Sequence, residues 1–252
     1  MDAVTLVLTP AASKRLIARA VAAMPAVQRA YTQGRLIVAG GTTNAYIVEE
    51  LTGECVEKAC YTAGIVVDSA WGMTAPGTRI KLLAVEAGQV SSRTWQEVLQ
   101  DFTPDDVFIK GGNAVDVDGH VGVLVGGKNG GTIGAAYGQI VTVGAHLILP
   151  VGLEKLIPSV IDAANALGPA SNDTTFGRPC GLFPVSYGTV VTEVDAIHLL
   201  YGLDAVHVHS GGVGGSEGAV GLVARGEASA CMRLRDDLAE LIKEPPIPAP
   251  SR

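Results

Sequence analysis

The feature that most constrains the fold is the alternation along the chain of short apolar runs, glycine-rich turns and helices. It is clearest in "RLIVAGGTTNAYIVEELTG", residues 35–53. Alternating strands and helices of this kind are typical of a largely parallel sheet covered by helices on both faces. We therefore expect an α/β fold with a mostly parallel, Rossmann-like sheet and a smaller C-terminal extension.

Apolar residues at helical spacing predict a first helix that is capped by Ser13, split by Pro25 and ended by Gly34. Further helices are expected in "NAYIVEEL", "TWQEVLQDF", "TIGAAYGQIVTVG" and "SVIDAANALG", and over Thr192–Tyr201 and Glu227–Lys243. Strands are expected in "RLIVA", "AGIVVD", "RIKLLAV", "DDVFIKGG", "HVGVLVGG", "HLILPVG", "LFPVS", "AVHVHS" and "AVGLVA". No internal repeat or linker divides these elements, so we expect a single domain over residues 1–242. The Pro-rich residues 243–252 are expected to be a disordered tail.

Composition narrows the class of partner. With 252 residues, 48% of them hydrophobic, the chain can bury a sizeable core. No apolar run approaches the ~18–20 residues of a membrane span, and the first residues lack a basic signal-peptide start, so a cytoplasmic protein without a membrane partner is expected. A net charge of −7 and an aromatic content of 5% argue against nucleic acid and favour a small molecule. The four cysteines form no CxxC pair, which predicts neither a disulfide framework nor a zinc site.

The turn between the strand "RLIVA" and the following helix is the first candidate site. Gly40 and Gly41 let the main chain approach a ligand, and the hydroxyl groups of Thr42 and Thr43 can donate hydrogen bonds. The N–H groups that open the next helix, near Asn44, favour an anion such as a phosphate or carboxylate. The alternative is a tight turn in which Thr43 or Asn44 caps the helix. The turn matches neither the Walker A pattern nor GxGxxG, which disfavours nucleotide hydrolysis.

Two later glycine-rich stretches also gather polar residues. Residues 108–136 carry Lys110, Asn113, Asp116, Asp118, His120, Lys128, Asn129 and Thr132 among their glycines. This stretch could wrap an anion with main-chain amides, or it could be a hairpin with solvated side chains. In residues 207–222, His207 and His209 share one face of the expected strand, but no further ligand has suitable spacing, and no metal is expected. Glu217 in the same stretch is either a nucleophile or base, or an exposed charge.

Four segments together resemble the superfamily of sugar-phosphate isomerases and coenzyme A transferases. This superfamily includes ribose-5-phosphate isomerase, glucosamine-6-phosphate deaminase and the effector domains of sugar-phosphate-responsive repressors. The segments are "SKRLIARAVAAM" with "GRLIVAGGTTNAYIVEEL", "DDVFIKGGNAVDVDG", "KNGGTIGAAYGQIVTVGAHLILP" and "VGLEKLIP". They cover Ser13 to Pro158 with a gap from Gly53 to Phe102. The resemblance implies that the Gly-Thr turn holds a phosphate, and that Lys128 and Lys155 match the two lysines of such sites.

The departures from the superfamily pattern limit what the resemblance implies. Lys110 and Asn113 stand where the isomerase has acidic residues, and Tyr137 stands at the position of its glutamate base. Since neither Asn113 nor an ordinary tyrosine can act as a carboxylate base near neutral pH, ribose-5-phosphate isomerisation is not expected. In "GGSEGAVGL", Glu217 resembles the nucleophilic glutamate of coenzyme A transferases, but the usual Asn is missing and the segment lies at an unexpected place in the chain.

These observations lead us to expect a homo-oligomeric protein that binds, and acts as an enzyme on, a small phosphorylated or carboxylated metabolite by isomerase-like or hydrolase-like chemistry. Acyl transfer with coenzyme A through Glu217 and a non-catalytic sugar-phosphate sensor are the alternatives, and no other cofactor and no metal are expected. The expected acid or base is Asp116, Asp118 or Glu217. The expected ligand contacts are Gly40, Gly41, Thr42, Thr43, Asn44, Lys110, Asn113, Lys128, Asn129, Gly130, Gly131, Thr132 and Lys155.

Overall fold

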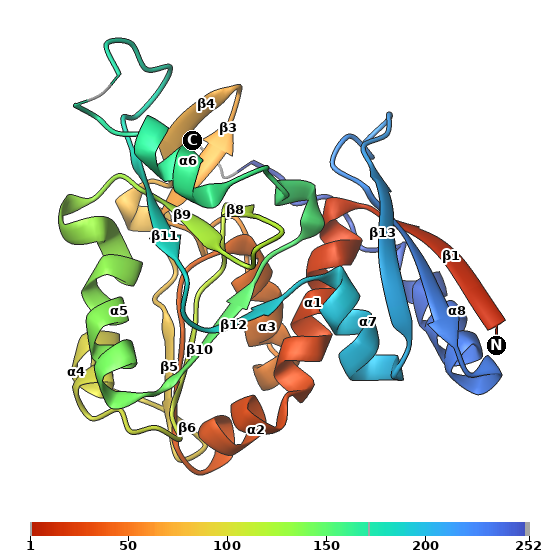
Figure 1. Ribbon diagram of the computed structural model, residues 1–252. Helices are drawn as coiled ribbons and strands as arrows, with labels where there is room; N and C mark the ends of the chain where they lie inside the picture. The colour runs from red at the N-terminus through yellow and green to blue at the C-terminus, as the bar shows by residue number, and fades with distance from the viewer. Residues whose placement is uncertain (1, 171, 250–252) are drawn as a thin grey trace.

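The computed structural model describes residues 2–170 and 172–249, and its centre is a sheet of six strands (Figure 1). The strands lie in the order β12-β10-β7-β2-β5-β6. β12, β10, β7 and β2 run parallel to one another, whereas β5 runs antiparallel to β2, and β6 to β5. The sheet is therefore mixed, with four parallel strands and an antiparallel edge, and the expected Rossmann-like character is not confirmed. Its strands are β2 (Arg35–Val38), β5 (Leu83–Glu86), β6 (Gln89–Val90), β7 (Val107–Ile109), β10 (His146–Pro150) and β12 (Thr189–Val191).

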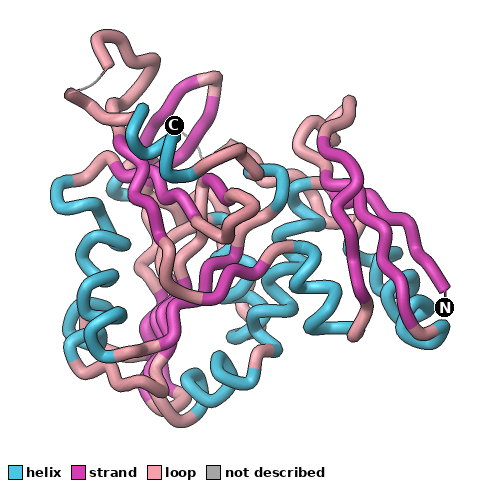
Figure 2. Tube along the Cα trace, viewed as in Figure 1, coloured by secondary structure: helices cyan, strands magenta, loops and turns pink. Residues whose placement is uncertain are grey.

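Alternate residues of the central strands enter two separate hydrophobic cores. Leu36 and Val38 belong to one core, while Ile37 between them belongs to the other, as the two-residue period of a strand requires. Helices cover both faces, as Figure 2 shows in cyan. The first core packs against α1 (Pro10–Ala23), α3 (Thr42–Thr52) and α7 (Glu193–Tyr201), and the second against α4 (Trp95–Gln100) and α5 (Gly131–Val143).

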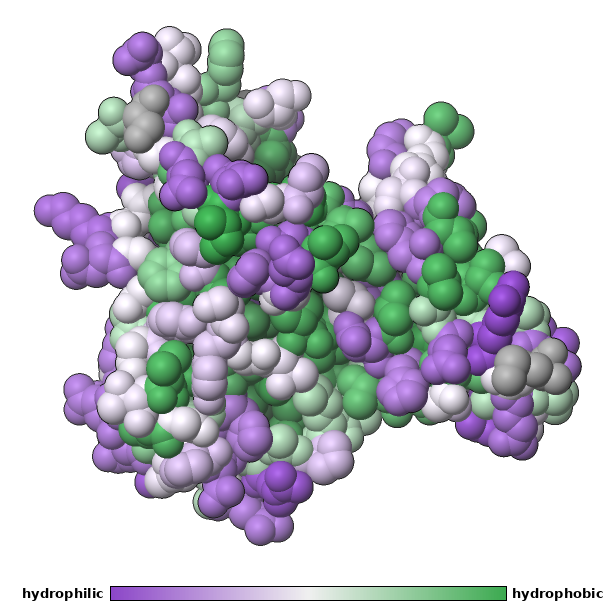
Figure 3. All heavy atoms as spheres, in the orientation of Figure 1, coloured by the Kyte–Doolittle hydropathy of each residue, from purple (hydrophilic) through white to green (hydrophobic). Residues whose placement is uncertain are grey.

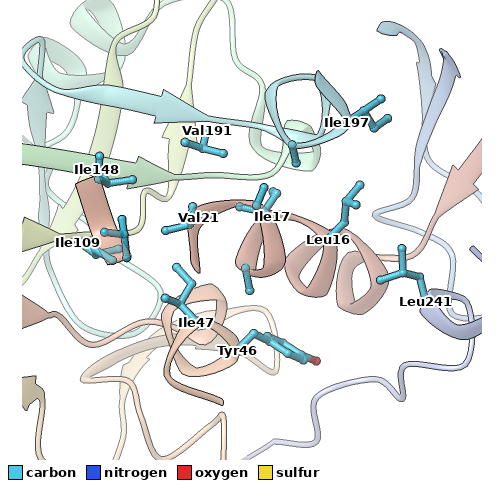
Figure 4. Packing of buried hydrophobic residues seen from close by; sticks show 14 of the residues in the cluster. Leu16, Ile17, Val21, Tyr46, Ile47, Ile109, Ile148, Val191, Ile197 and Leu241 are labelled. Atoms are coloured by element: carbon cyan, nitrogen blue, oxygen red, sulfur yellow. The ribbon is translucent and has the colours of Figure 1, made fainter. Parts of the chain in front are cut away.

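Helix α1 contributes many of its side chains to the first core. In Figure 4, its Ile17 and Val21 lie between the side chains of Val191 and Ile47, and all four are 1% exposed or less. Burying each such side chain contributes about 1.5–3 kcal/mol. Thr9 caps α1 by accepting from Ala12 N at 3.3 Å, so the expected cap at Ser13 is wrong.

The expected break at Pro25 is confirmed, because α1 ends at Ala23 and α2 (Pro25–Thr32) begins with the proline. Proline lacks an N–H and cannot continue the hydrogen-bond ladder of the preceding helix, but it is well suited to a first helical position. The two helices then run against the sheet at different angles, as Figure 1 shows.

A second sheet, of three strands, lies on the side of α1 and α7 that faces away from the six-stranded sheet. Here β1 (Asp2–Leu8) and β13 (Asp204–Ser210) both pair antiparallel with β14 (Val220–Gly226), and α8 (Ala228–Leu241) packs on the sheet. The sequence pattern predicts β13 and β14, but not the strand at residues 2–8. The smaller C-terminal extension is thus completed by the first strand of the chain.

The remaining elements lie above the carboxyl ends of the parallel strands in Figure 1. They are a hairpin of β3 (Gly64–Val67) and β4 (Ala70–Met73), a sheet in the order β11-β9-β8, and the short helix α6. Their bounds are β8 (Ala114–Val115), β9 (Val121–Val125), β11 (Gly181–Val185) and α6 (Val160–Ala166), with 3-10 turns at η1 (Pro76–Thr78), η2 (Lys128–Gly130) and η3 (Leu153–Lys155).

The Pro-rich segment, expected to be a disordered tail, makes specific contacts where the structure describes it. Glu244 accepts hydrogen bonds from Arg15 at 3.0 and 3.2 Å, and Ile247 packs against the first core. Residues 250–252 lie outside the described part of the chain. Among the described residues, none of the helices has the length and apolar character that crossing a lipid bilayer requires.

Candidate functional site

The candidate site lies where the four parallel strands end side by side. The Gly-Thr turn follows β2, residues 110–113 follow β7, residues 151–155 follow β10, and Thr192 and Glu193 follow β12. Ligands of open α/β sheets bind at this edge, because the loops there meet the N-termini of helices. Figure 3 shows a notch in the surface between the tip of the β13–β14 hairpin and the lobe above the sheet, and α1 begins at the floor of this notch (Figure 1).

The Gly-Thr turn brings the main chain close to its neighbours and opens helix α3. Gly41 precedes the helix and donates from its N–H to Tyr61 O at 2.8 Å. A side chain at Gly40 would lie only 3.1 Å from the same carbonyl oxygen, so glycine fits best there. Within the described chain, no side chain caps α3. The alternative of a cap by Thr43 or Asn44 is therefore not found, and the first N–H groups of α3 remain uncapped by side chains.

Asn44 ties the Gly-Thr turn to the next strand instead of capping the helix. It is fully buried, and its Nδ2 donates to Ala39 O at 2.7 Å and to Ile109 O at 3.4 Å. Its Oδ1 has no hydrogen-bond partner among the described residues. A side chain at Gly111 would lie 3.5 Å from this oxygen, which therefore faces the main chain that follows β7. Asn44 thus fixes the β2 and β7 turns against each other and leaves one buried acceptor unused.

Two lysines follow adjacent strands and lie near each other. Lys110 donates from Nζ to Gly111 O at 2.9 Å, and Lys155 donates to Gly112 O at 3.0 Å. Burial lowers the pKa of Lys110 to about 8, with a smaller contribution from the charge of Lys155. Burial also lowers the pKa of Lys155, an effect that nearby glutamates only partly offset. Both ammonium groups are thus held where positive charge is unfavourable.

A set of charged residues continues the site toward α1 and α7. Lys14 of α1 donates to Glu154 Oε1 at 3.1 Å, and Lys155 Nζ lies 3.9 Å from the same oxygen. Burial alone would raise the pKa of Glu154, but Lys155 and Lys14 outweigh it and lower that pKa. Glu193 is completely buried and accepts from Leu153 N at 2.8 Å. Burial, followed by the charge of Glu154, raises the pKa of Glu193 to about 7.

The sequence pattern does not identify Lys14, Glu154 and Glu193 as site residues. Lys14 has the position of an ordinary lysine near a helix start, and Glu193 that of a favourable acid in a first helical turn. Glu154 stands beside the expected Lys155, and this adjacency is the one available signal. Their convergence depends on α1 and α7 packing against the same strand ends, which no local pattern specifies.

The predicted residues Asn113, Asp116 and Asp118 lie in and around the β8–β9 turn. Asn113 accepts from Leu124 N at 3.0 Å. Asp116 is buried, and its carboxylate accepts from His120 N and Val160 N, both at 2.9 Å. Burial would raise the pKa of Asp116, but these hydrogen bonds lower it. Asp118 is exposed.

Asp116, Asp118 and His120 place possible ligand atoms within 4.8 Å of one another. Both oxygens of Asp116 already accept hydrogen bonds from the protein, from His120 N on one side and from Val160 N on the other. The carboxylate therefore joins the turn to the start of α6. The grouping by itself does not define a metal centre.

The predicted residues 128–132 form η2 and the start of α5. Lys128 and Asn129 are exposed, and Gly130 packs beside Phe183. Asn129 has a φ of 60°, which places it in the left-handed region. The structure links the turns after β2, β7 and β10 by hydrogen bonds. Within the described residues, no hydrogen bond or ion pair links the 128–132 segment to the Gly-Thr turn.

The third glycine-rich stretch, residues 207–222, approaches the site at Gly218. Glu217 is exposed, and its Oε2 accepts from Gly215 N at 3.0 Å within the same loop. A side chain at Gly218 would lie 2.9 Å from Pro10 Cγ and 3.9 Å from Glu154 Cβ, so the loop packs on the start of α1.

His207 and His209 do not form the shared face that the strand pattern predicts, because a register shift separates them in β13. His207 Nε2 lies 2.9 Å from Ser210 Oγ and 3.0 Å from His209 O. The ring of His209 covers Gly221 in the neighbouring strand. A strand bulge thus turns the two rings toward different neighbours.

Comparisons with known proteins add no relative. No protein-family model, no curated protein and no solved structure matches this chain.

Proposed function

We propose that this chain binds a small phosphorylated or carboxylated metabolite at the carboxyl edge of its parallel strands and catalyses a proton transfer on it. The observation that carries this proposal is the pair Lys110 and Lys155. Each ammonium group donates to a main-chain carbonyl, at Gly111 and Gly112, and each has a pKa lowered by burial. Such a pair is stabilised by an anion placed between or beside the two amines.

The Gly-Thr turn supports the same ligand chemistry. The first N–H groups of α3 have no side-chain cap from the described residues, and a helix N-terminus favours negative charge. Asn44 holds this turn against the strand end that carries Lys110. A ligand with an anionic group at the turn would therefore place its remaining atoms near the lysines.

The lowered pKa of Lys110 also supports chemistry rather than binding alone. With a pKa of about 8, a measurable fraction of this side chain is a neutral amine near neutral pH. A neutral lysine amine can accept a proton from carbon or attack a carbonyl group. Isomerase-like proton transfer requires such a base and no metal or redox partner. The resemblance to the sugar-phosphate isomerase superfamily and the parallel pairing of β2, β7, β10 and β12 support this proposal.

A ligand panel tests the proposal. Inorganic phosphate, sugar phosphates, small carboxylates and coenzyme A compounds are each added in a thermal-shift assay, where a ligand at 100 times its Kd adds about 2.7 kcal/mol of stability. We expect stabilisation by phosphate or a sugar phosphate, its loss in Lys155→Met, and its retention in the control Lys128→Met, which removes an exposed lysine. Stabilisation of both variants by phosphate would contradict the assignment of the site.

The same panel separates the two alternatives. If a metabolite stabilises the protein but NMR of that metabolite shows no conversion, the result would support the sensor. Stabilisation by coenzyme A compounds alone would support acyl transfer through Glu217, a residue whose carboxylate is engaged within its own loop. Thr43→Val tests the Gly-Thr turn directly, because it removes a hydroxyl group while the side-chain volume changes little.

A further inference from the structure

Two buried carboxyl oxygens in the candidate site lie near each other, and neither makes a hydrogen bond within the described residues. Glu154 Oε2 and Glu193 Oε1 are both buried, and neither has a hydrogen-bond partner among the described residues. The other oxygen of each carboxyl group is engaged, Glu154 Oε1 by Lys14 and Glu193 Oε2 by Leu153 N. Each carboxyl group therefore has one bonded oxygen and one oxygen without a partner in the described chain.

Gly152 shows that these two oxygens share one small space. A Cβ built at Gly152 would overlap Glu154 Oε2 and would lie 3.0 Å from Glu193 Oε1. Both oxygens thus lie within about 3 Å of the position that a Cβ of residue 152 would occupy. Two ionised carboxylates this close in a buried place repel each other strongly, and a single proton held by the pair removes that repulsion.

We propose that Glu154 and Glu193 share one proton and form the acid–base pair of the candidate site, an inference that rests on the function proposed above. The surrounding charges support this assignment. Lys14 from α1 and Lys155 from η3 both stabilise the ionised form of Glu154, which makes Glu193 the partner that holds the proton. Ser13 from α1 also faces Glu193 and opposes the rise of its pKa, but burial and Glu154 outweigh it.

The pair is placed to exchange protons with a ligand. The side chain of Lys155 is 24% exposed and that of Glu154 is 12% exposed, whereas Glu193 is fully enclosed. Glu154 therefore connects the buried proton to the ligand side. In proton transfer on a carbonyl-bearing anion, Lys110 takes a proton from carbon, the C–H electron pair moves toward the carbonyl oxygen, and the pair gives that oxygen its proton. The reverse steps return one proton to carbon and one to the pair, so no other reagent is consumed.

Carbon-13 NMR of the glutamate carboxyl groups in the full-length chain tests the shared proton without any ligand. Glu193→Gln and Glu154→Gln assign the two signals, and Glu217→Gln is the matched control on a glutamate of another loop. We expect the titration midpoint of Glu193 to move to lower pH in Glu154→Gln, because the neighbouring negative charge is removed, and to stay unchanged in Glu217→Gln. An unmoved Glu193 midpoint in Glu154→Gln would overturn the pairing. Because Glu154→Gln leaves Glu193 intact, this test does not depend on the folding of Glu193→Gln.

Calorimetry with inorganic phosphate tests the connection to the ligand. Phosphate bound beside Lys155 weakens the positive field on Glu154, which raises the proton affinity of the pair. Titrations in buffers of different ionisation enthalpy should show proton uptake on phosphate binding, and Glu193→Gln should lose most of it while retaining binding. Equal uptake in the wild type and Glu193→Gln would overturn the acid–base role. Absence of phosphate binding to the wild type would instead contradict the anion site. The NMR titration tests the pairing of Glu154 with Glu193 independently of phosphate binding.

Discussion

Lys110 is expected to lower the stability of the folded protein and to strengthen the binding of an anionic ligand, and Lys110→Met tests both effects. Burial lowers the pKa of Lys110 from 10.5 to about 8. At 1.36 kcal/mol per pKa unit, this shift corresponds to about 3 kcal/mol of destabilisation when the lysine is charged. Lys110 retains some contact with solvent, so this value is an upper limit.

The direction of the pH dependence follows from proton binding. Below pH 8 the lysine is protonated in both the folded and the unfolded chain, and the full cost of burial is present. Between pH 8 and 10.5 the folded protein releases the proton before the unfolded chain does, so this group makes stability rise with pH. Lys110→Met also removes the hydrogen bond to Gly111 O, worth about 1 kcal/mol. We therefore expect a net stabilisation of up to about 2 kcal/mol at pH 7.

Denaturant unfolding at neutral and alkaline pH measures this effect, with Lys128→Met as the control at an exposed position. The Lys110→Met protein should be more stable than the wild type at pH 7, should lose this advantage at alkaline pH, and should bind phosphate more weakly. A loss of stability at pH 7, or the same advantage at every pH, would show that the buried ammonium group does not destabilise the folded protein.

Three further outcomes are expected. Because the pKa of Glu193 is raised from 4.5 to about 7, this group should make the wild type lose about 3 kcal/mol of unfolding free energy as pH rises from 4.5 to 7. Denaturant unfolding of Glu193→Gln should not show this loss, and equal pH curves for the two proteins would contradict the prediction. Tyr61→Phe should cost about 1–3 kcal/mol in thermal unfolding, since the hydroxyl donates to Val38 O and accepts from Leu83 N in a buried place, and a neutral result would show that water replaces it. Asp116→Ala should lower the melting temperature by removing the acceptor of two main-chain N–H groups, yet leave phosphate binding intact; loss of binding in a folded variant would return Asp116 to the site.

The parts of the fold that the sequence predicts are those fixed by local chemistry. Pro25 breaks a helix because of its own ring, and the strand, glycine turn and helix around Gly40 follow from residues next to one another. Strand direction is not local. Residues 204–210 and 220–226 are predicted as strands in the same way as those of the parallel set, but they pair antiparallel. Their partner β1 lies at the opposite end of the chain, so no short window of sequence contains the pairing.

The candidate site divides in the same way. The Gly-Thr turn, Lys110 and Lys155 follow strands closely, and the edge of the sheet brings them together. Glu193 looks like a favourable acid in a first helical turn, and only the packing of α7 against η3 buries it beside Glu154. Lys128 and Glu217 match motifs in residue type, but motif spacing does not determine where a loop points once its supporting strands pair in other sheets.

The pairing of β1 with β14 constrains the order in which the protein can be completed during synthesis. All strands of the six-stranded sheet are present once residue 191 has emerged, so this sheet can assemble on the nascent chain. β1 is made long before its partner, residues 220–226, and a strand without its partner is open to pairing with other chains. Thr9 alone separates β1 from α1, so the waiting strand is attached directly to the helix that carries one side of the candidate site. A ribosome-bound chain that ends before β14 should therefore be prone to aggregation, because the strand that pairs with β1 has not yet been made.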